Sequence, residues 1–371
     1  ASDPTGAASV NLGELAEAIN KGESKIGIGT KFLAWIKSWF GGDSYDTAIA
    51  KQAFIKITDE QRTVLLTMAF EAAIGPEGPG EAQNVQENVQ AVLKFCQAVG
   101  IKAEHVAEAI SSTPNFGDRK SEVVLDLANA GKEGAECLRQ LLELDKLTNL
   151  PEFEGDEAQQ LVLGLAGTWE GIDCLFWLFR LRKLTNLPKF ESDVAKQLVL
   201  RLAGTYCMQP NGGFCLQLNR DCLHPSRAYL THPEGAYCLR ELLEDNKLTN
   251  LPKFTRAETR QLIPELVFQS RRNDGNGAKC VLLLLDDNKL TLSRFASDVA
   301  KEVALLLTSL HDLKLANEYG AECLRRLLEE GVMENLRVEG ISSNYTKEYV
   351  LRLIEREQYG HLALFLRERN Y

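Results

Sequence analysis

The 371-residue sequence has no apolar run near the roughly 20 residues that a helix needs to cross a bilayer. We therefore expect no transmembrane segment. It also lacks the phosphate-binding patterns GxGxxG and Walker A, the zinc-protease motif HExxH and the hydrolase motif GxSxG. These absences leave no standard motif for nucleotide binding, metalloprotease chemistry or α/β-hydrolase chemistry.

An excess of positive charge is lacking as well, because 52 acidic residues outweigh 42 basic ones and give a net charge of −10. Binding to nucleic acid requires clustered Lys and Arg, so we expect no nucleic-acid partner. The nine cysteines are an odd number, which argues against a closed disulfide framework. This cysteine usage favours a reducing compartment.

One segment of the chain is repeated almost unchanged. LTNLPEF at 147–153 recurs as LTNLPKF at 184–190, 37 residues later, and again at 248–254, after a further 64 residues. A weaker copy occupies 290–295. The prolines bar helix continuation and make these segments loops. Repetition at this period indicates one supersecondary unit that is stacked several times.

Each copy of the loop is followed by two helical patterns. Ser192 and Asp193 are expected to cap the first, in which Val194, Leu198 and Leu202 form an apolar face at helical spacing. The second helix is written Gly-Ala-x-Cys-Leu in three copies, at 134–143, 235–244 and 320–329, with a variant at 277–286. Gly331 is expected to end its helix. The unit is therefore a helix pair.

The predicted fold class is all-α, a superhelical array (α-solenoid) of helix-pair repeats with an N-terminal helical cap region. We place the N-terminal helical region, which divergent repeats could also explain, at 10–115 and the array at 116–371. A long insertion at 205–234 interrupts the array, since the loop spacing there exceeds 37 residues by 27. We expect its last helix pair within 346–367.

The recurring thiols are predicted to pack inside the repeats. A cysteine at the same helical position in each unit acts most simply as a small buried apolar residue. The residues are Cys137, Cys174, Cys238, Cys280 and Cys323.

The insertion carries five side chains that soft metals bind. Zinc would stiffen this segment, although the spacing C-x7-C-x6-C-x-H-x7-H fits no standard finger. The alternatives are an ordinary long loop, a disulfide or a Cys–His catalytic pair. We otherwise expect no cofactor. The candidate ligands are Cys207, Cys215, Cys222, His224 and His232.

Aromatic residues are concentrated at 31–40, where Trp35 and Trp39 share a helical face. This face is predicted to close the start of the core. The alternatives are docking into a partner's groove or lying at a membrane surface, which the negative net charge disfavours.

A set of basic residues recurs on the outer side of the predicted repeats. Arginine could bind an acidic segment of a partner through forked hydrogen bonds. The alternative is that each arginine pairs with a glutamate one turn away. The candidates are Arg139, Arg240 and Arg325 on the second helices, and Lys189 and Lys253 in the loops.

The pattern Gly-x-x-Cys-Leu-Arg-x-Leu-Leu-Glu resembles the helices of a degenerate ankyrin repeat, and 359–366 is the closest piece. The resemblance spans 116–371, but the sequence lacks Thr-Pro-Leu-His and the period exceeds 33 residues. Such arrays are similar in style to effectors that bacteria inject into host cells. The resemblance implies a protein–protein interaction scaffold in the cytoplasm, or in the host cytosol if the chain is secreted. The alternatives are an enzyme with a site in 205–234 or the N-terminal region, and a membrane-associated adaptor using 31–40.

Overall fold

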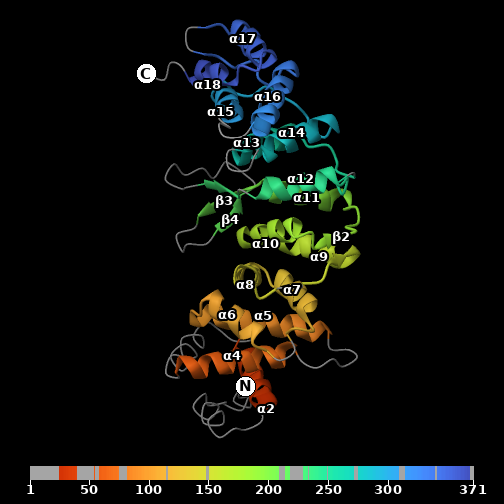
Figure 1. The fold of residues 1–371 in the computed structure, drawn as a ribbon, viewed down its shortest axis with the longest axis vertical. Coiled ribbons are helices and arrows are strands. Elements are labelled where there is room, and N and C mark those ends of the chain that lie inside the picture. Colours follow the sequence, from red (N-terminus) through yellow and green to blue (C-terminus); the bar gives the residue numbers. More distant parts are fainter. Residues whose placement is uncertain are drawn as a thin grey trace, which may run out of the picture. The chain divides into compact units, whose positions relative to one another are not determined.

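The computed structural model describes residues 25–39, 54, 58–74, 82–113, 116–147, 150–208, 214–217, 229–232, 234–248, 250–270, 275–308, 314–338 and 341–367. These residues form sixteen α-helices and five strands of at most four residues (Figure 1). The prediction of an all-α fold is confirmed at this level. By its contacts the chain divides into two compact units, Ala1–Asn186 and Leu187–Tyr371. The predicted boundary at 115/116 stays a prediction.

The first unit contains eight helices and one pair of short parallel strands among its described residues. The predicted N-terminal helical region includes α4 and α5, which pack against each other. The elements are α2 (Lys25–Trp39), α4 (Asp59–Ile74), α5 (Ala82–Val99), α6 (Ala103–Ser111), α7 (Lys120–Asn129), α8 (Lys132–Glu143), β1 (Phe153–Glu154), α9 (Gly155–Leu165), α10 (Trp169–Arg180) and β2 (Leu184–Thr185).

The second unit contains the remaining eight described helices and a three-stranded antiparallel sheet. The last two helices match the final pair that the sequence predicts. The elements are α11 (Ser192–Ala203), β3 (Thr205–Met208), β4 (Phe214–Gln217), β5 (Tyr229–Thr231), α12 (Gly235–Glu244), α13 (Arg256–Ser270), α14 (Asn276–Asp286), α15 (Ser297–Thr308), α16 (Lys314–Glu329), α17 (Ser343–Glu355) and α18 (Tyr359–Arg367).

The glycine that opens the second helix of a pair allows the two helices to approach closely. A Cβ atom on Gly171 would overlap the carbonyl oxygen of Leu165, at the end of the preceding helix. Gly277 has the same relation to Leu266. The side chain of Thr168 caps α10 by accepting the N–H of Gly171 at 3.1 Å. Glycine at this position is therefore a packing requirement of the repeat.

The second helices end in a shared hydrogen-bonded turn. In α10, Arg182 adopts a φ of 53° and donates its N–H to the Phe179 carbonyl at 2.9 Å. Lys183 then donates to the Leu178 carbonyl at 2.8 Å, which completes a Schellman motif. The corresponding residues with positive φ are Asp145, Asn246, Asn288 and Gly331. Gly331 thus ends its helix as predicted.

The repeated loop is anchored by a buried phenylalanine and by one backbone bond. Phe153 donates its N–H to the Lys183 carbonyl at 2.7 Å, and the Phe190 N–H reaches the Lys247 carbonyl at 3.0 Å. The same bond joins Phe254 to Lys289 at 2.7 Å. Each ring is fully buried. The repeated LTNLPxF segment therefore connects one helix pair to the next.

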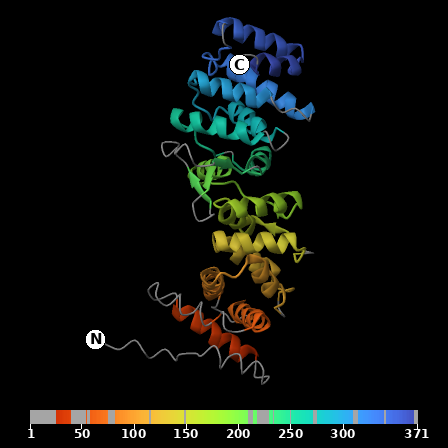
Figure 2. The same ribbon diagram turned by 90° about the vertical axis from the view of Figure 1, so that its left-hand side faces the viewer.

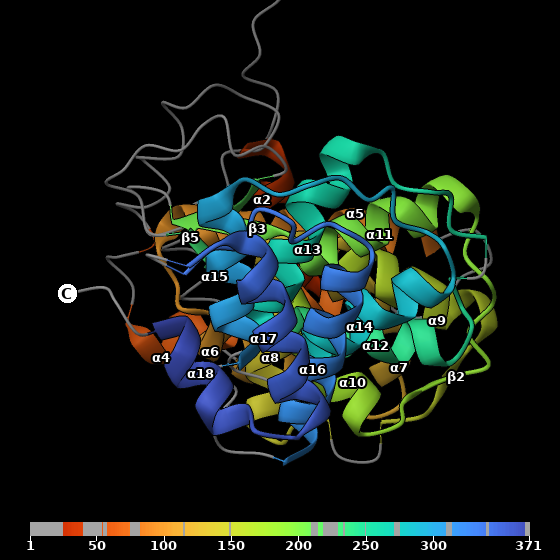
Figure 3. The same cartoon turned by 90° about the horizontal axis from the view of Figure 1, so that it is seen from above.

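Within each unit the second helices pack on one another. The Cys174 thiol donates to the Ala135 carbonyl at 3.4 Å, which fixes the register of α10 against α8 (Figures 1 and 2). In the second unit Cys280 makes the equivalent bond to Ala236 at 3.3 Å, and α12, α14 and α16 lie close together (Figures 1 and 3). The thiols of all five predicted packing cysteines are buried.

Two local predictions need correction. The N-cap of α11 is Glu191, without a side-chain cap bond, so that Ser192 and Asp193 are its first helical residues. The insertion is more than a loop, because β3 pairs with both β4 and β5 (Figure 1). Neither the β3–β4 pairing nor the β3–β5 pairing could be predicted from the sequence, because the paired segments have only weak periodicity of their own.

Candidate partner-binding site

Helix α10 departs from the other second helices at the positions that face outward. Two residues after the repeat cysteine, three copies hold arginine, at Arg139, Arg240 and Arg325, whereas α10 holds Phe176. The next position is Gln140 in α8 and Trp177 in α10. The copy in α14 holds Leu282 and Leu283 at these positions, neither fully exposed, so α10 is the copy with aromatic residues there and the one in which such a side chain, Trp177, is exposed.

The aromatic replacement is exposed. Trp177 retains 39% of its accessible surface, and it lies one turn from Leu181, which retains 50%. Leu144 holds the repeat position of Leu181 on the neighbouring helix α8, and it is 38% exposed. Because the cysteine bond sets α8 and α10 in register, the ends of these helices that carry Leu144 and Leu181 lie at the same side. Leu144, Trp177 and Leu181 are thus three exposed apolar side chains on two helices that pack against each other, and we call them the apolar group.

Basic side chains flank this apolar group. The Arg180 guanidinium stands 5.5 Å from the centre of the Trp177 ring and 5.9 Å from that of Phe176, which is cation–π range. Arg182 is exposed and Lys183 is half-buried. We call this surface the α8–α10 face; it consists of Leu144, Trp177, Leu181, Arg180, Arg182 and Lys183.

The arginines predicted to bind a partner are engaged within the protein. Arg139 pairs with Glu143 one turn along α8. Arg325 donates to Glu322 at 2.8 Å and to Glu329 at 2.5 Å. These contacts match the alternative in which each arginine pairs with a glutamate on its own helix.

Arg240 is held most firmly of the three. It donates to the Asn276 side-chain oxygen at 2.6 Å, pairs with Glu241 and approaches Glu244 at 3.3 Å. Its guanidinium also stands 4.8 Å from the centre of the Tyr237 ring. Arg240 therefore ties α12 to α14.

The two loop lysines differ in their contacts. Both lysines are exposed. Lys253 donates to the Asn288 side-chain oxygen at 3.0 Å. Both belong to the second unit.

Trp35 is part of the core of the first unit, as the simpler prediction had it. It is buried, stacks on Phe32 at 5.5 Å between ring centres and meets Phe95 edge-on at 5.7 Å. The buried ring favours the core role of Trp35 over docking to a partner. Trp39 ends α2, and its side chain lies outside the described residues.

The predicted metal ligands are only partly described. Cys207 and Cys215 are opposite each other in the β3–β4 pair, with only their backbone described, and Cys222 and His224 lie outside the described residues. His232 is fully buried, and its Nδ1 accepts the N–H of Glu234 at 3.1 Å. The residues that the structure describes include no group of three or more His, Cys, Asp or Glu arranged for a metal ion. The zinc interpretation stays a prediction.

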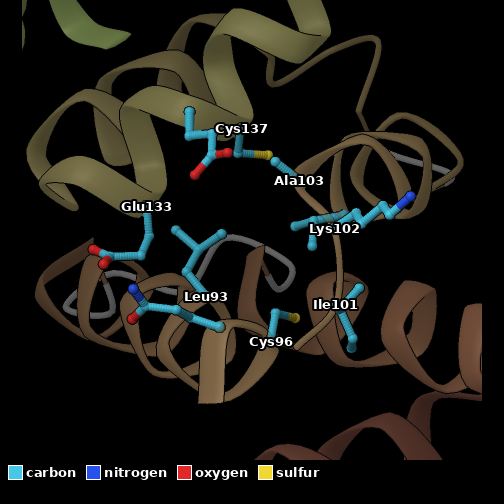
Figure 4. A pocket seen from close by; sticks show the side chains of 10 residues that line it. Leu93, Cys96, Ile101, Lys102, Ala103, Glu133 and Cys137 are labelled. Atoms are coloured by element: carbon cyan, nitrogen blue, oxygen red, sulfur yellow. The ribbon is translucent and has the colours of Figure 1, made fainter. Parts of the chain in front are cut away.

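A small pocket of about 130 Å³ lies between α5, the start of α6 and α8 (Figure 4). Cys96 and Cys137 line it from facing helices, beside Lys102 and Glu133. Burial raises the pKa of both thiols above its usual range, and a thiol that keeps its proton is a poor nucleophile. The pocket therefore favours packing over catalysis.

Comparisons with protein-family models, curated proteins and solved structures find no match to this chain. No described helix has both the length and the apolar character that a membrane span requires. Function is therefore inferred from the residues and their geometry.

The α8–α10 face was missed at the level of the sequence, although a signal was present. Aligning the second helices by their cysteines shows Phe176 and Trp177 where α8, α12 and α16 are polar and α14 has two leucines, Leu282 and Leu283. The sequence does not show which of these side chains is exposed, and an aromatic residue on a helix is most often part of a core. Trp35 and Trp177 illustrate the two outcomes.

Proposed function

We propose that this chain is a protein–protein interaction scaffold, a superhelical array of helix pairs that binds a partner protein through the α8–α10 face. The observation that carries the proposal is the exposure of Trp177 beside Leu144 and Leu181. Exposed aromatic and aliphatic residues rimmed by arginine are typical of binding hot spots, where Trp and Arg are enriched. An origin as an injected bacterial effector and the ankyrin-like resemblance stay predictions.

The repeat itself supplies the contrast that supports this proposal. In α8 the position of Trp177 is held by Gln140, next to the Arg139–Glu143 pair on the outward side. A helix with glutamine at this position packs in the same way, so the fold does not require a tryptophan at the equivalent position of α10. Leaving a tryptophan partly in water forgoes part of the free energy of its burial, about 25 cal/mol per Å² of apolar surface. A partner that covers it would recover that free energy.

The test uses substitutions that copy residues from other repeats. Trp177→Gln reproduces the Gln140 of α8, and Leu181→Asp reproduces the Asp245 of α12. The double variant W177Q/L181D should keep its circular dichroism spectrum and melting temperature. We expect it to lose the proteins that the unmodified chain captures after cross-linking in the cells that express it, as quantified by mass spectrometry.

The matched control is Y345Q/L364D, which makes the same chemical changes at two more exposed residues of the second unit. It should capture the same proteins as the unmodified chain. The proposal fails if the captured proteins are the same for W177Q/L181D, or if both double variants lose them equally.

A further inference from the structure

We infer that the segment docking on the α8–α10 face is acidic and apolar. It would be a stretch of another protein that sets Asp or Glu carboxylates beside one or two large apolar side chains. This inference rests on the proposed function and adds the chemistry of the partner. It comes from the charge of one helix end, which differs from the corresponding ends in the other copies.

Among the five corresponding ends of the described second helices, only the end of α10 has a net positive charge. Residues 180–183 read RLRK and carry three positive charges. The equivalent residues 143–146 read ELDK and 244–247 read EDNK, each with two carboxylates and one lysine. Residues 286–289, DDNK, have the same balance, and 329–332, EEGV, have two carboxylates alone. The local sign is thus reversed in one copy of a chain whose net charge is −10.

The reversed charge is not needed to end the helix. Asp145 and Asn246 make the same left-handed turn and the same pair of backbone bonds as Arg182. The side chains of Arg182 and Lys183 form no ion pair within the part of the chain that the structure describes. These cations are therefore available to a partner, and arginine binds carboxylates with two parallel hydrogen bonds.

The positions of the apolar and basic groups suit a single docked segment. Arg180 lies against the Trp177 ring, so that a carboxylate bound there is next to the exposed indole. Leu144 and Leu181 continue the apolar surface at the neighbouring helix ends. A segment that alternates carboxylates and apolar residues over one or two helical turns would match both. A purely apolar partner would leave three cations without counter-charges.

A flat anionic membrane is less suited to this face. The exposed Glu152 and Glu154 flank Phe153, whose N–H binds the Lys183 carbonyl at 2.7 Å. Carboxylates therefore stand beside the basic end of α10, and they would repel a continuous anionic surface. A narrow peptide can contact Arg180 and Arg182 and avoid these carboxylates.

The experiment selects peptides from a phage-displayed library of random 16-residue sequences against the immobilised full chain. The strongest binders are resynthesised, and their affinities are measured by fluorescence anisotropy at low and high salt. Two variants are compared with the unmodified chain. W177Q removes the apolar anchor without changing charge, and R180E/R182E installs acidic residues like Glu143 and Asp145, which other copies hold at these positions. The control, R256E/R337E, makes the same charge change at two exposed arginines of the second unit.

We expect enriched peptides with several Asp or Glu residues beside Leu, Phe or Trp. Their affinity should fall about tenfold or more in both W177Q and R180E/R182E, the scale of a hot-spot contact. It should also fall with added salt and stay unchanged in the control variant.

Two results separate the two ideas. Peptides that need Trp177 but lack carboxylates and ignore R180E/R182E overturn the acidic partner and leave the proposed function standing. Selected peptides that bind W177Q as well as the unmodified chain, or a selection that yields none, overturn the inference and count against this face as a peptide-binding site. In a parallel flotation assay, binding to phosphatidylserine-containing vesicles that R180E/R182E abolishes would assign the face to a membrane instead.

Discussion

Burial decides the chemistry of the repeat cysteines. Cys137, Cys238 and Cys323 are at most 1% exposed, and in Cys137 and Cys323 burial raises the thiol pKa above its ordinary value. Neighbouring charges raise it further, with Glu322 beside Cys323. The thiols of Cys137 and Cys323 therefore remain protonated in the folded protein at physiological pH. Their role is packing, as their recurrence at one helical position predicts.

We predict that none of these three thiols reacts with iodoacetamide at pH 8 while the protein is folded. Each Cys→Ala variant should lose about 1 kcal/mol of unfolding free energy, a typical single-substitution effect. Because the folded pKa of Cys137 and Cys323 is raised, these two protonated thiols stabilise the fold fully below about pH 9.0, and this contribution falls as the pH rises further. Rapid labelling of all three in protein with an intact helical spectrum would show that they are accessible.

Asp126 gives a second prediction at the level of one side chain. It lies on α7, where burial and then the charge of Glu122 raise its pKa to about 6. Its contribution to stability is therefore fully present below about pH 3.8 and is lost as the pH rises through about 6. At neutral pH the folded protein holds a carboxylate that would be better solvated in the unfolded chain.

Asp126→Asn should consequently raise the unfolding free energy at pH 8. We expect a gain of about 1 kcal/mol once the pKa shift is discounted for the partial exposure of the group. The gain should vanish at pH 4, where the wild-type carboxyl is itself largely protonated. Urea titrations at the two pH values measure this difference, and a gain of equal size at both would point to a cause other than charge.

At the scale of the element, the joint between the two helices of a pair depends on glycine. Replacing glycine by alanine inside a helix normally stabilises it by about 1 kcal/mol. Gly171→Ala should do the opposite, because the new Cβ overlaps the Leu165 carbonyl oxygen and forces α9 and α10 apart. We expect a net loss of about 2 kcal/mol, on the scale of an overpacked core.

Gly117→Ala is the matched control, since a Cβ atom there meets nothing within 4 Å. Its unfolding free energy should change little. If G171A unfolds at the same urea concentration as the wild type, the close approach of the helices does not limit the repeat, and the glycine needs another explanation.

At the scale of the whole molecule, the division into two compact units predicts how the chain unfolds. Phe32 and Phe153 belong to the core of the first unit, and Phe190 and Phe254 belong to that of the second. Two compact units with separate cores need not unfold together, so we expect incomplete cooperativity over the 371 residues. We therefore expect a calorimetric unfolding enthalpy larger than the van't Hoff value.

Phe254→Ala tests this expectation from one side. Deleting the ring should cost about 3–5 kcal/mol, the range for a buried phenylalanine. Hydrogen exchange should accelerate in 187–371 more than in 1–186. Equal acceleration in both units, with a single two-state transition, would show that the chain unfolds as one body.

Much of the helical architecture was readable from the amino-acid order, because the interactions that define it are local. Helical spacing of leucines, a proline that breaks the helix and a glycine at a helix end act within a few residues. Because the same pattern occurs in several copies, each of these predictions rests on more than one segment of the sequence. Gly331 at its helix end and the buried Phe190 were therefore predictable.

Contacts between distant segments settled the rest. Trp35 and Trp177 are the same residue in similar helical contexts, yet one ring is packed between Phe32 and Phe95 and the other remains exposed. The sequence predicts Arg240 as a surface cation, but in the structure it donates a hydrogen bond to Asn276, 36 residues away. The pairing of β3 with β5 likewise joins parts of the insertion that show no pattern alone. Exposure and pairing depend on which elements become neighbours, and no short stretch of sequence contains that information.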